Sequence, residues 1–337
     1  MELNVDFPEL AKSIAKNNKY ITDKYAPEVE NVIHQLHLRQ FPNIREVDNE
    51  SCSKSIPFSH ANIEDVETYL DLLYGDNISK KVDGAVMILK LCKDVEHFEP
   101  LVQNKQLMSA ISRVYNDDYE TSLELSFNLG RIFFALSNFS ETHSILCNLG
   151  IGGTTLKMID LELRRVRHRV DIDRTNWPDE TNTAATQQDC LTFVGLSLLL
   201  NLAENTTVER KMVKKGLIHI LLSFLDYSEY TSTIGICLKF LLKLSFIEDN
   251  VHIMIRENSV QRLLILLSSS HNDTVLTVLR LLLNLSFKEE NREGMIELNL
   301  IEPLVQLLKR SSMRAKALRL KYHLKVACRL ANCVCQN

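Results

Sequence analysis

The side chains that could carry out catalysis or bind a metal are scattered along this chain of 337 residues. Phosphate-binding glycine motifs, the zinc-protease motif H-E-x-x-H and the serine-hydrolase motif G-x-S-x-G are absent from the sequence. Asp171 and Asp173 in "DIDRTN" are two residues apart, but no Gly or terminal Glu completes a calcium loop. The histidines are equally dispersed, and we expect surface or packing roles for His143, His168, His219 and His252. The sequence therefore predicts no enzyme, no cofactor and no metal site, and favours a function based on binding.

The polar residues that do recur belong to an internal repeat. Three segments align without gaps: "LSLLLNLAENTTVERKMVKKGLIHILLSFL" (196–225), "LKFLLKLSFIEDNVHIMIRENSVQRLLILL" (238–267) and "LRLLLNLSFKEENREGMIELNLIEPLVQLL" (279–308). Asn201, Lys243 and Asn284 then fall in register, separated by 42 and 41 residues. A period of about 40–47 residues is typical of HEAT and armadillo arrays.

Each repeat predicts three helices. Gly216, Asn258 and Asn299 coincide in the alignment, and Gly and Asn are the residues that most readily adopt a positive φ after a helix end. An apolar segment with helical spacing follows each of them, and a short segment around a Met precedes each. We therefore expect an all-α, armadillo-type α-solenoid, a right-handed superhelix of three-helix repeats, with buried layers that include Leu199, Leu242 and Leu283.

In armadillo arrays the third helix of each unit lines a concave groove, and an Asn in its last turn can bind the backbone of a partner. The corresponding partner-binding candidates are Asn138, Asn201, Lys243 and Asn284, and one turn earlier Phe134, Ser197, Lys239 and Arg280. These Asn residues could instead simply end their helices. As groove residues, Lys239, Lys243 and Arg280 would form a cationic strip that favours an acidic extended segment.

The composition agrees with a helical protein that is not inserted in a membrane. The chain is 45% hydrophobic and 24% charged, with a formal net charge of −4, and contains few glycines and prolines. No apolar stretch reaches the roughly 18–20 residues that span a bilayer, and no signal peptide is recognisable. The eight cysteines include no C-x-x-C pair, which favours a reducing, cytoplasmic compartment.

The chain divides into three parts. Residues 1–60 are predicted to be a helical lead-in and a polar linker, and residues 61–308 to be armadillo-like repeats. A polar loop insertion is expected at 164–188, either as a variable surface loop or as a partner-binding loop anchored by Trp177. Residues 309–337 are basic and divergent, with eight Lys and Arg. This segment suggests a chain cut short or a substituted C-terminus, and less readily a tail that binds nucleic acid or membrane.

Three stretches resemble the kinesin-associated protein family, the armadillo-repeat non-motor subunit of heterotrimeric kinesin-II. They are "EDVETYLDLLYGDNISKKVDGAVMILKLCKD" (64–94), "ELSFNLGRIFFALSNFSETHSILCNLGIGGTTLKMIDLELRR" (124–165) and "LRLLLNLSFKEENREGMIELNLIEPL" (279–304). The resemblance covers about residues 1–308 and does not extend over 309–337. From the resemblance we expect that the family's extreme N-terminal segment and its further repeats have no counterpart in this sequence.

The resemblance implies an adaptor that binds the tail regions of kinesin-II motor subunits and links them to cargo proteins. Microtubule-based transport would place it in the cytoplasm, including the cilium, with no nucleic acid and no membrane insertion among its interactions. The alternative is a peptide receptor of another pathway, such as nuclear transport. That function would require a Trp one turn before each Asn, and Phe134, Ser197, Lys239 and Arg280 stand there instead.

Overall fold

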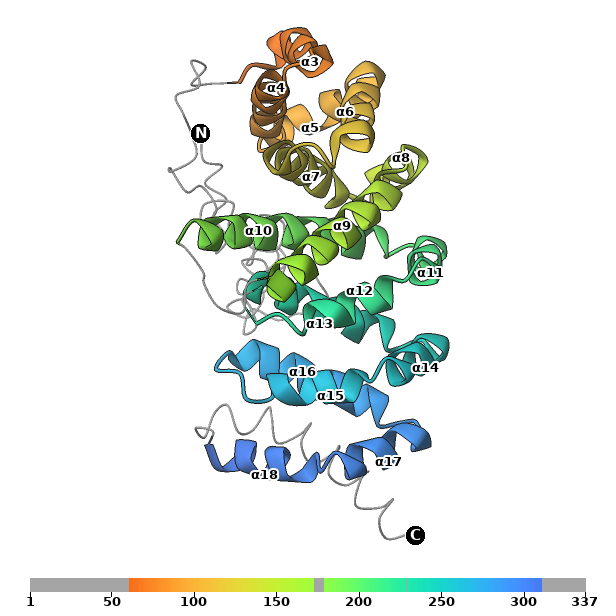
Figure 1. Cartoon of the computed structure of the whole chain (residues 1–337). Helices are drawn as coiled ribbons and strands as arrows, with labels where there is room; N and C mark the ends of the chain where they lie inside the picture. The colour runs from red at the N-terminus through yellow and green to blue at the C-terminus, as the bar shows by residue number, and fades with distance from the viewer. Residues whose placement is uncertain (1–60, 173–178, 229, 311–337) are drawn as a thin grey trace, which may run out of the picture. The chain divides into compact units, whose positions relative to one another are not determined.

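The computed structural model describes residues 61–172, 179–228 and 230–310, and these residues form helices connected by short turns (Figure 1). Within these residues there is no strand, and no helix is long and apolar enough to cross a membrane. The expected segment 1–60 and residues 311–337 of the expected segment 309–337 lie outside the described residues, as does Trp177. The last described helix continues to Arg310.

The helices follow one another as repeated sets of three. Two helices come first, α3 (Val66–Tyr74) and α4 (Ile78–Leu91), preceded by η2 (Ile63–Asp65). Four sets follow, with the short helices η3 (Val95–His97) and η4 (Ser140–Thr142) in their first turns. They are α5 (Phe98–Gln103), α6 (Lys105–Asp118) and α7 (Leu123–Ser137); α8 (His143–Asn148), α9 (Ile151–Ile172) and α10 (Asp179–Leu202); α11 (Thr206–Lys214), α12 (Leu217–Phe224) and α13 (Thr231–Leu244); and α14 (Glu248–Arg256), α15 (Ser259–Leu266) and α16 (Asn272–Leu285). The described array closes with α17 (Glu289–Glu297) and α18 (Ile301–Arg310).

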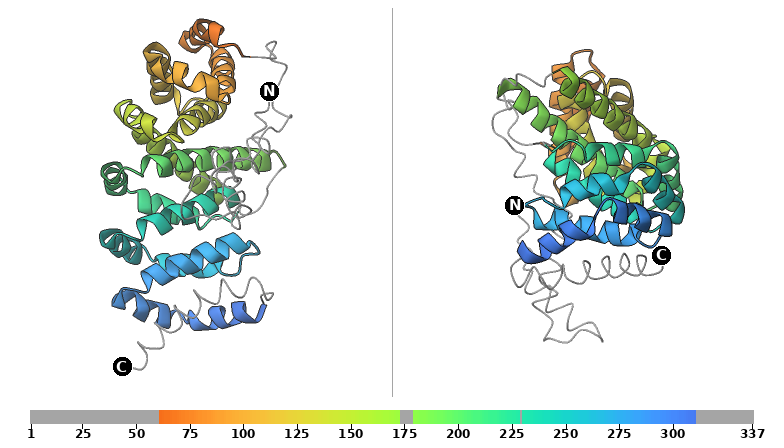
Figure 2. Two further views of the ribbon diagram at one scale, coloured as in Figure 1. Left: turned by 180° about the vertical axis from the view of Figure 1, so that it is seen from behind. Right: turned by 60° about the horizontal axis from the view of Figure 1, so that its bottom comes forward.

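Successive sets stack through their last helices, which we call the third helices: α4, α7, α10, α13 and α16. Each third helix packs on the next one along the chain. The short helices α11, α14 and α17 lie one above the other along one edge (Figure 1), and the view from behind in Figure 2 shows the same edge. The structure thus confirms the predicted all-α solenoid.

The turn between the first and second helices of a set contains a left-handed residue at the three predicted positions, whereas Asn104, between α5 and α6, has φ −73°. Gly216 has φ 89°, Asn258 has φ 54° and Asn299 has φ 52°. Gly150, which precedes α9, has φ 76° and is a fourth such turn that the sequence alignment did not identify. Gly and Asn occupy these positions because a left-handed backbone costs other residues about 1–2 kcal/mol.

The core runs through the array along the third helices. Leu199 and Leu283 are buried as predicted, but Leu242 is only partly buried. The residue of α13 that occupies the position of Leu199 is Leu241, and in α16 it is Leu282, and all three are fully buried. The prediction for Leu242 was wrong by one residue, which in a helix is a rotation of about 100° away from the core.

The polar loop predicted at 164–188 is also corrected. Helix α9 continues to Ile172 and α10 already begins at Asp179, so much of the expected loop is helical. These helices contain 22 and 24 residues, whereas α12 and α13 contain 8 and 14. The extra residues of this repeat therefore lengthen its second and third helices, and the polar composition that suggested a loop belongs largely to helical residues.

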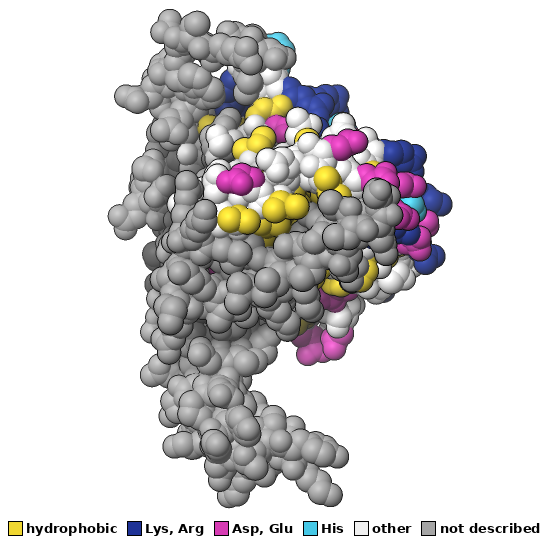
Figure 3. Space-filling model, turned by 90° about the horizontal axis from the view of Figure 1, so that it is seen from below, with side chains coloured by type: hydrophobic (Ala, Val, Ile, Leu, Met, Phe, Trp, Pro, Cys, Tyr) yellow, Lys and Arg dark blue, Asp and Glu magenta, His cyan; other side chains and the backbone are white. Residues whose placement is uncertain are grey.

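The end of the described array exposes apolar side chains. On α17 and α18 and in the turn between them, Leu298, Ile301 and Val305 are exposed, while Leu300 and Leu304 are buried. Figure 3 views the molecule from this end and shows hydrophobic side chains beside a charged edge. Some apolar side chains of α18 are thus buried in the array, and others are exposed on the surface of the described part.

The corrected core register predicts a contrast between neighbouring leucines of α13. Leu241→Ala should lower the free energy of unfolding by about 2–5 kcal/mol, because it opens a cavity between layers. Leu242→Ala should cost clearly less, since that side chain is only partly buried. Chemical denaturation of both variants would test this, and equal losses would contradict the register.

The left-handed turn predicts opposite effects for two glycines. Gly216→Ala should destabilise the protein by about 1–2 kcal/mol, because its φ of 89° is strained for any residue with a Cβ. Gly235→Ala is the matched control inside α13, where an added Cβ would meet no atom within 4 Å. That change should stabilise by about 0.5–1 kcal/mol. Thermal unfolding measures both, and two shifts of the same sign would refute the assignment.

Candidate partner-binding surface

The backbone at the end of each third helix determines which residues are equivalent. One hydrogen bond recurs there: Glu204 N donates to Asn201 O at 3.1 Å, and Phe287 N donates to Asn284 O at 3.3 Å. In α7 the same bond runs from Asn138 N to Ala135 O at 3.4 Å. Ala135, rather than Asn138, is therefore the residue equivalent to Asn201.

This three-residue correction also accounts for the left-handed turn at Gly150. Gly150 follows Ala135 by fifteen residues, as Gly216 follows Asn201. The sequence comparison placed Asn138 in the row because it took Ala135–Asn138 as a copy of the repeat with a shortened loop after it. Asn138 lies just beyond the end of α7, where it caps the helix, and is thus displaced from the predicted row.

Two of the predicted asparagines bind the layer before their own. Asn201 Nδ2 donates to Ser137 Oγ at 2.9 Å and to Asn138 Oδ1 at 3.1 Å. Asn284 Nδ2 donates to Ser245 Oγ at 2.8 Å. We call each of these contacts between successive third helices a rung. The rungs show that these amides join layers, in addition to standing near the ends of their helices.

The serine of each rung is held in place by its own helix. Ser137 Oγ donates to the Phe134 carbonyl at 2.8 Å, and Ser245 Oγ donates to the Leu242 carbonyl at 2.7 Å. The hydroxyl hydrogen is thereby used, so the oxygen faces the incoming amide as an acceptor. Each rung is a two-bond chain from an Asn amide through a Ser hydroxyl to a helix carbonyl.

The rung between α10 and α13 uses different residues. Ala203 replaces the serine, and Lys243 replaces the asparagine. Lys243 Nζ donates to the Ala203 carbonyl at 3.0 Å and to Glu209 Oε2 at 2.5 Å. Because alanine has no hydroxyl, an Asn at position 243 would lack the serine partner, whereas lysine reaches the backbone oxygen. The Glu209 side chain is only 3% exposed, so Lys243 also compensates a buried carboxylate.

The row one turn earlier is only partly the predicted one. By the corrected register it contains Arg131, Ser197, Lys239 and Arg280, and Phe134 is displaced from it. The Arg131 guanidinium lies over the Phe127 ring, 5.3 Å from the ring centroid. Ser197 is buried and donates to the Phe193 carbonyl at 2.7 Å, so it is part of the packing rather than the surface.

The predicted cationic strip is therefore reduced. Lys239 is exposed and Arg280 is half-buried, whereas the charge of Lys243 is directed towards Glu209. The positive surface of α13 and α16 rests mainly on Lys239 and Arg280, with Lys243 in a structural role between layers.

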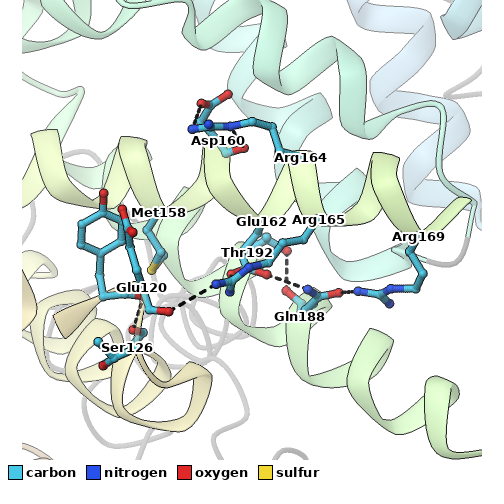
Figure 4. A network of polar contacts seen from close by, with 12 residues as sticks. Glu120, Ser126, Met158, Asp160, Glu162, Arg164, Arg165, Arg169, Gln188 and Thr192 are labelled. Carbon is cyan, nitrogen blue, oxygen red and sulfur yellow. Dashed lines mark hydrogen bonds and ion pairs between the residues drawn. The ribbon is translucent and has the colours of Figure 1, made fainter. Parts of the chain in front are cut away.

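The lengthened helices α9 and α10 contain a buried polar network (Figure 4). The Glu162 carboxylate is almost fully buried and accepts hydrogen bonds from Arg165 Nη1 at 2.6 Å and from Gln188 Nε2 at 2.7 Å. Gln188 Oε1 in turn accepts from Arg169 and, at 3.1 Å, from the Tyr230 hydroxyl. Glu162 and Gln188 fall next to or within the segment predicted to be a loop, where the sequence carried no signal that they would be buried.

This network continues into a helix cap supplied from another layer. Asp189 of α10 accepts from Thr233 N at 2.9 Å and from Ser232 N at 3.2 Å, the first turn of α13. A carboxylate at a helix N-terminus satisfies unpaired N–H groups and interacts favourably with the helix dipole. The lengthened α10 thus fixes the start of α13, whose other end carries Lys239 and Lys243.

Chemically reactive groups are not gathered on the described part of the chain. No cluster of three or more His, Cys, Asp or Glu residues suited to a metal ion occurs among the described residues. Burial raises the pKa of the Cys92 thiol to about 12 and that of Cys237 well above its ordinary value. Both thiols therefore stay protonated and weakly nucleophilic at neutral pH.

Comparison with solved structures defines the fold class as an armadillo-type α-solenoid. A designed armadillo repeat protein in complex with the peptide (KR)4 matches with a TM-score of 0.57 at 12% identity, over 77% of this chain and 99% of that chain. A structure described for the interaction between cadherin and beta-catenin matches with a TM-score of 0.60 at 15% identity, over 98% of this chain and 54% of that chain. At these identities the likeness establishes the fold alone.

The family is established by sequence. The family model of kinesin-associated protein matches residues 1–336, and the chain belongs to that family. The match continues through the basic segment that was expected to diverge from the family at 309–337, so that expectation was wrong. The family associates this scaffold with kinesin, in agreement with the expected adaptor role.

The rungs predict energetic coupling between layers. In a double-mutant cycle, Asn284→Ala and Ser245→Ala should show a coupling of about 0.5–1.5 kcal/mol, the net contribution of one hydrogen bond. The control cycle pairs Asn284→Ala with Ser137→Ala, which belongs to another rung and should be additive. Urea unfolding of the single and double variants provides the measurement, and equal coupling in the two cycles would show that the rung contributes nothing specific.

Proposed function

We propose that this protein is a non-enzymatic adaptor that binds the tail regions of both kinesin-II motor subunits and links them to cargo proteins. The family match over residues 1–336 is the observation that carries this proposal. The work would take place in the cytoplasm on microtubules, including transport along cilia. A solenoid suits the task because each added layer lengthens one continuous binding surface.

The third helices supply the groups that would hold an extended motor segment. Lys239 and Arg280 would attract acidic side chains and raise the association rate. The rungs use the amide nitrogens of Asn201 and Asn284 as donors, and the amide oxygen of an Asn side chain is an acceptor. These oxygens would accept hydrogen bonds from the partner's backbone N–H groups, independently of the partner's sequence.

A charge reversal on the exposed row tests this binding mode. Lys239→Glu should weaken the complex with the kinesin-II motor tails by about tenfold and reduce its salt dependence, because one attractive charge becomes repulsive. Lys214→Glu is the matched control, since Lys214 is also exposed but lies on α11. Lys243 is unsuitable, because a Glu there would face the buried Glu209 carboxylate.

Calorimetry on the purified full chain with both motor tails, without nucleotide or metal, measures the affinities at several salt concentrations. A complex that forms equally well with both variants would move the motor site to another face. The absence of any complex with wild-type protein would refute the adaptor function, and preferential binding of a Lys-rich nuclear signal would support the alternative peptide receptor.

A further inference from the structure

Two large aromatic side chains are exposed at equivalent places in successive layers. Phe246 follows the end of α13 and is 77% exposed, and Phe287 follows the end of α16 and is 59% exposed. The equivalent positions in the two preceding layers hold Asn138 and Glu204. The aromatic pair, Phe246 and Phe287, is therefore confined to the two layers that also carry Lys239 and Arg280.

The cations and the phenylalanines occupy equivalent positions in the two layers. Lys239, Lys243 and Phe246 are separated by four and three residues, and so are Arg280, Asn284 and Phe287. The first two residues of each set share one face of their helix, and each phenylalanine follows the helix end by two residues. Because α13 packs directly on α16, the two sets of residues lie in adjacent layers, each with a cation seven residues before an exposed phenylalanine.

An ion pair joins the two turns that carry the aromatic pair. Lys288, next to Phe287, bonds to Glu248, which lies two residues after Phe246. This contact holds the pKa of Glu248 below its ordinary value. The ion pair therefore contributes to folding stability at pH values above the pKa that Glu248 has in the unfolded chain. This contribution is lost as the pH falls through the lower pKa that Glu248 has in the folded protein. The turns that present both rings are thus connected to each other.

We infer that the aromatic pair and its two cations bind an extended, acidic peptide segment that carries two apolar side chains on one side. Exposed aromatic rings that recur on adjacent layers are more than scattered surface residues, and they suit apolar anchors. Lys239 and Arg280 select for acidic residues in the same segment. This inference rests on the proposed function only in treating the third-helix face as peptide-binding, and it specifies the chemistry of the segment.

The spacing of the layers limits the spacing of the two anchors. Packed helices are about 8–10 Å apart, and an extended or polyproline-type chain advances about 3.1–3.4 Å per residue. Two apolar side chains about three residues apart would therefore reach successive layers.

A defined peptide tests the inference on the full chain. The probe is a fluorescein-labelled peptide of Glu and Ser with two Leu residues three positions apart, measured by fluorescence anisotropy. Two matched peptides replace both Leu by Ser, or every Glu by Lys. We expect the Leu- and Glu-containing peptide to bind best. Phe246→Ala and Phe287→Ala should each weaken it by about fivefold or more, as expected for anchor residues.

The control variant is Ile265→Ala, which removes an apolar side chain that is 70% exposed on α15 and should leave binding unchanged. The inference is overturned if Phe246→Ala binds like Ile265→Ala, or if the Ser-substituted or Lys-substituted peptide binds as well as the probe. It is also overturned if the aromatic pair instead mediates self-association, seen by sedimentation as a dimer that Phe246→Ala abolishes. Motor chains are absent from this assay, so its failure leaves the adaptor function standing, and failure of the motor complex leaves this inference standing.

Discussion

Each set of three helices leaves an apolar face that only the neighbouring set can bury, and the rest of the described structure depends on this constraint. Leu199, Leu241 and Leu282 meet it by occupying one position in three successive third helices, each fully buried. Once those leucines face the core, the helical period determines which residues of the same helices reach the surface. The polar rows are therefore a consequence of core packing as much as of binding.

The rungs show how polar groups at a packed interface are satisfied without disturbing that stacking. Asn201 and Asn284 each bond to a serine of the preceding layer. Where that serine is absent, at Ala203, a lysine replaces the asparagine and bonds to the backbone instead. Both arrangements provide a hydrogen-bond acceptor for a donor group at the boundary between layers. An amide or ammonium group that is buried there without an acceptor would destabilise the fold.

The lengthened pair α9 and α10 provides a second kind of connection between layers. Its buried Glu162 is compensated by an arginine and a glutamine, and Asp189 caps the first turn of α13. Since removing one partner of a buried charged pair is far more costly than removing an exposed one, this junction should tolerate little change. It orients the helix whose other end presents Lys239 and Phe246. A structural junction and a candidate binding surface thus share one helix.

The sequence by itself determined the fold class, the period of the array and three of its left-handed turns. The hydrophobic repeat and the preference of Gly and Asn for a positive φ are local properties of the sequence. They were enough to predict turns such as those at Gly216 and Asn258. The sequence did not predict the lengthening of α9 and α10, because polar residues suggest a loop unless their buried partners are known. Likewise, the alignment placed Asn138 three residues out of register, and only the hydrogen bond to Ala135 corrected it. Only the tertiary structure distinguished Lys239 from Lys243, which look alike in the sequence. Packing brings the buried Glu209 carboxylate against Lys243, whereas Lys239 is exposed on the surface.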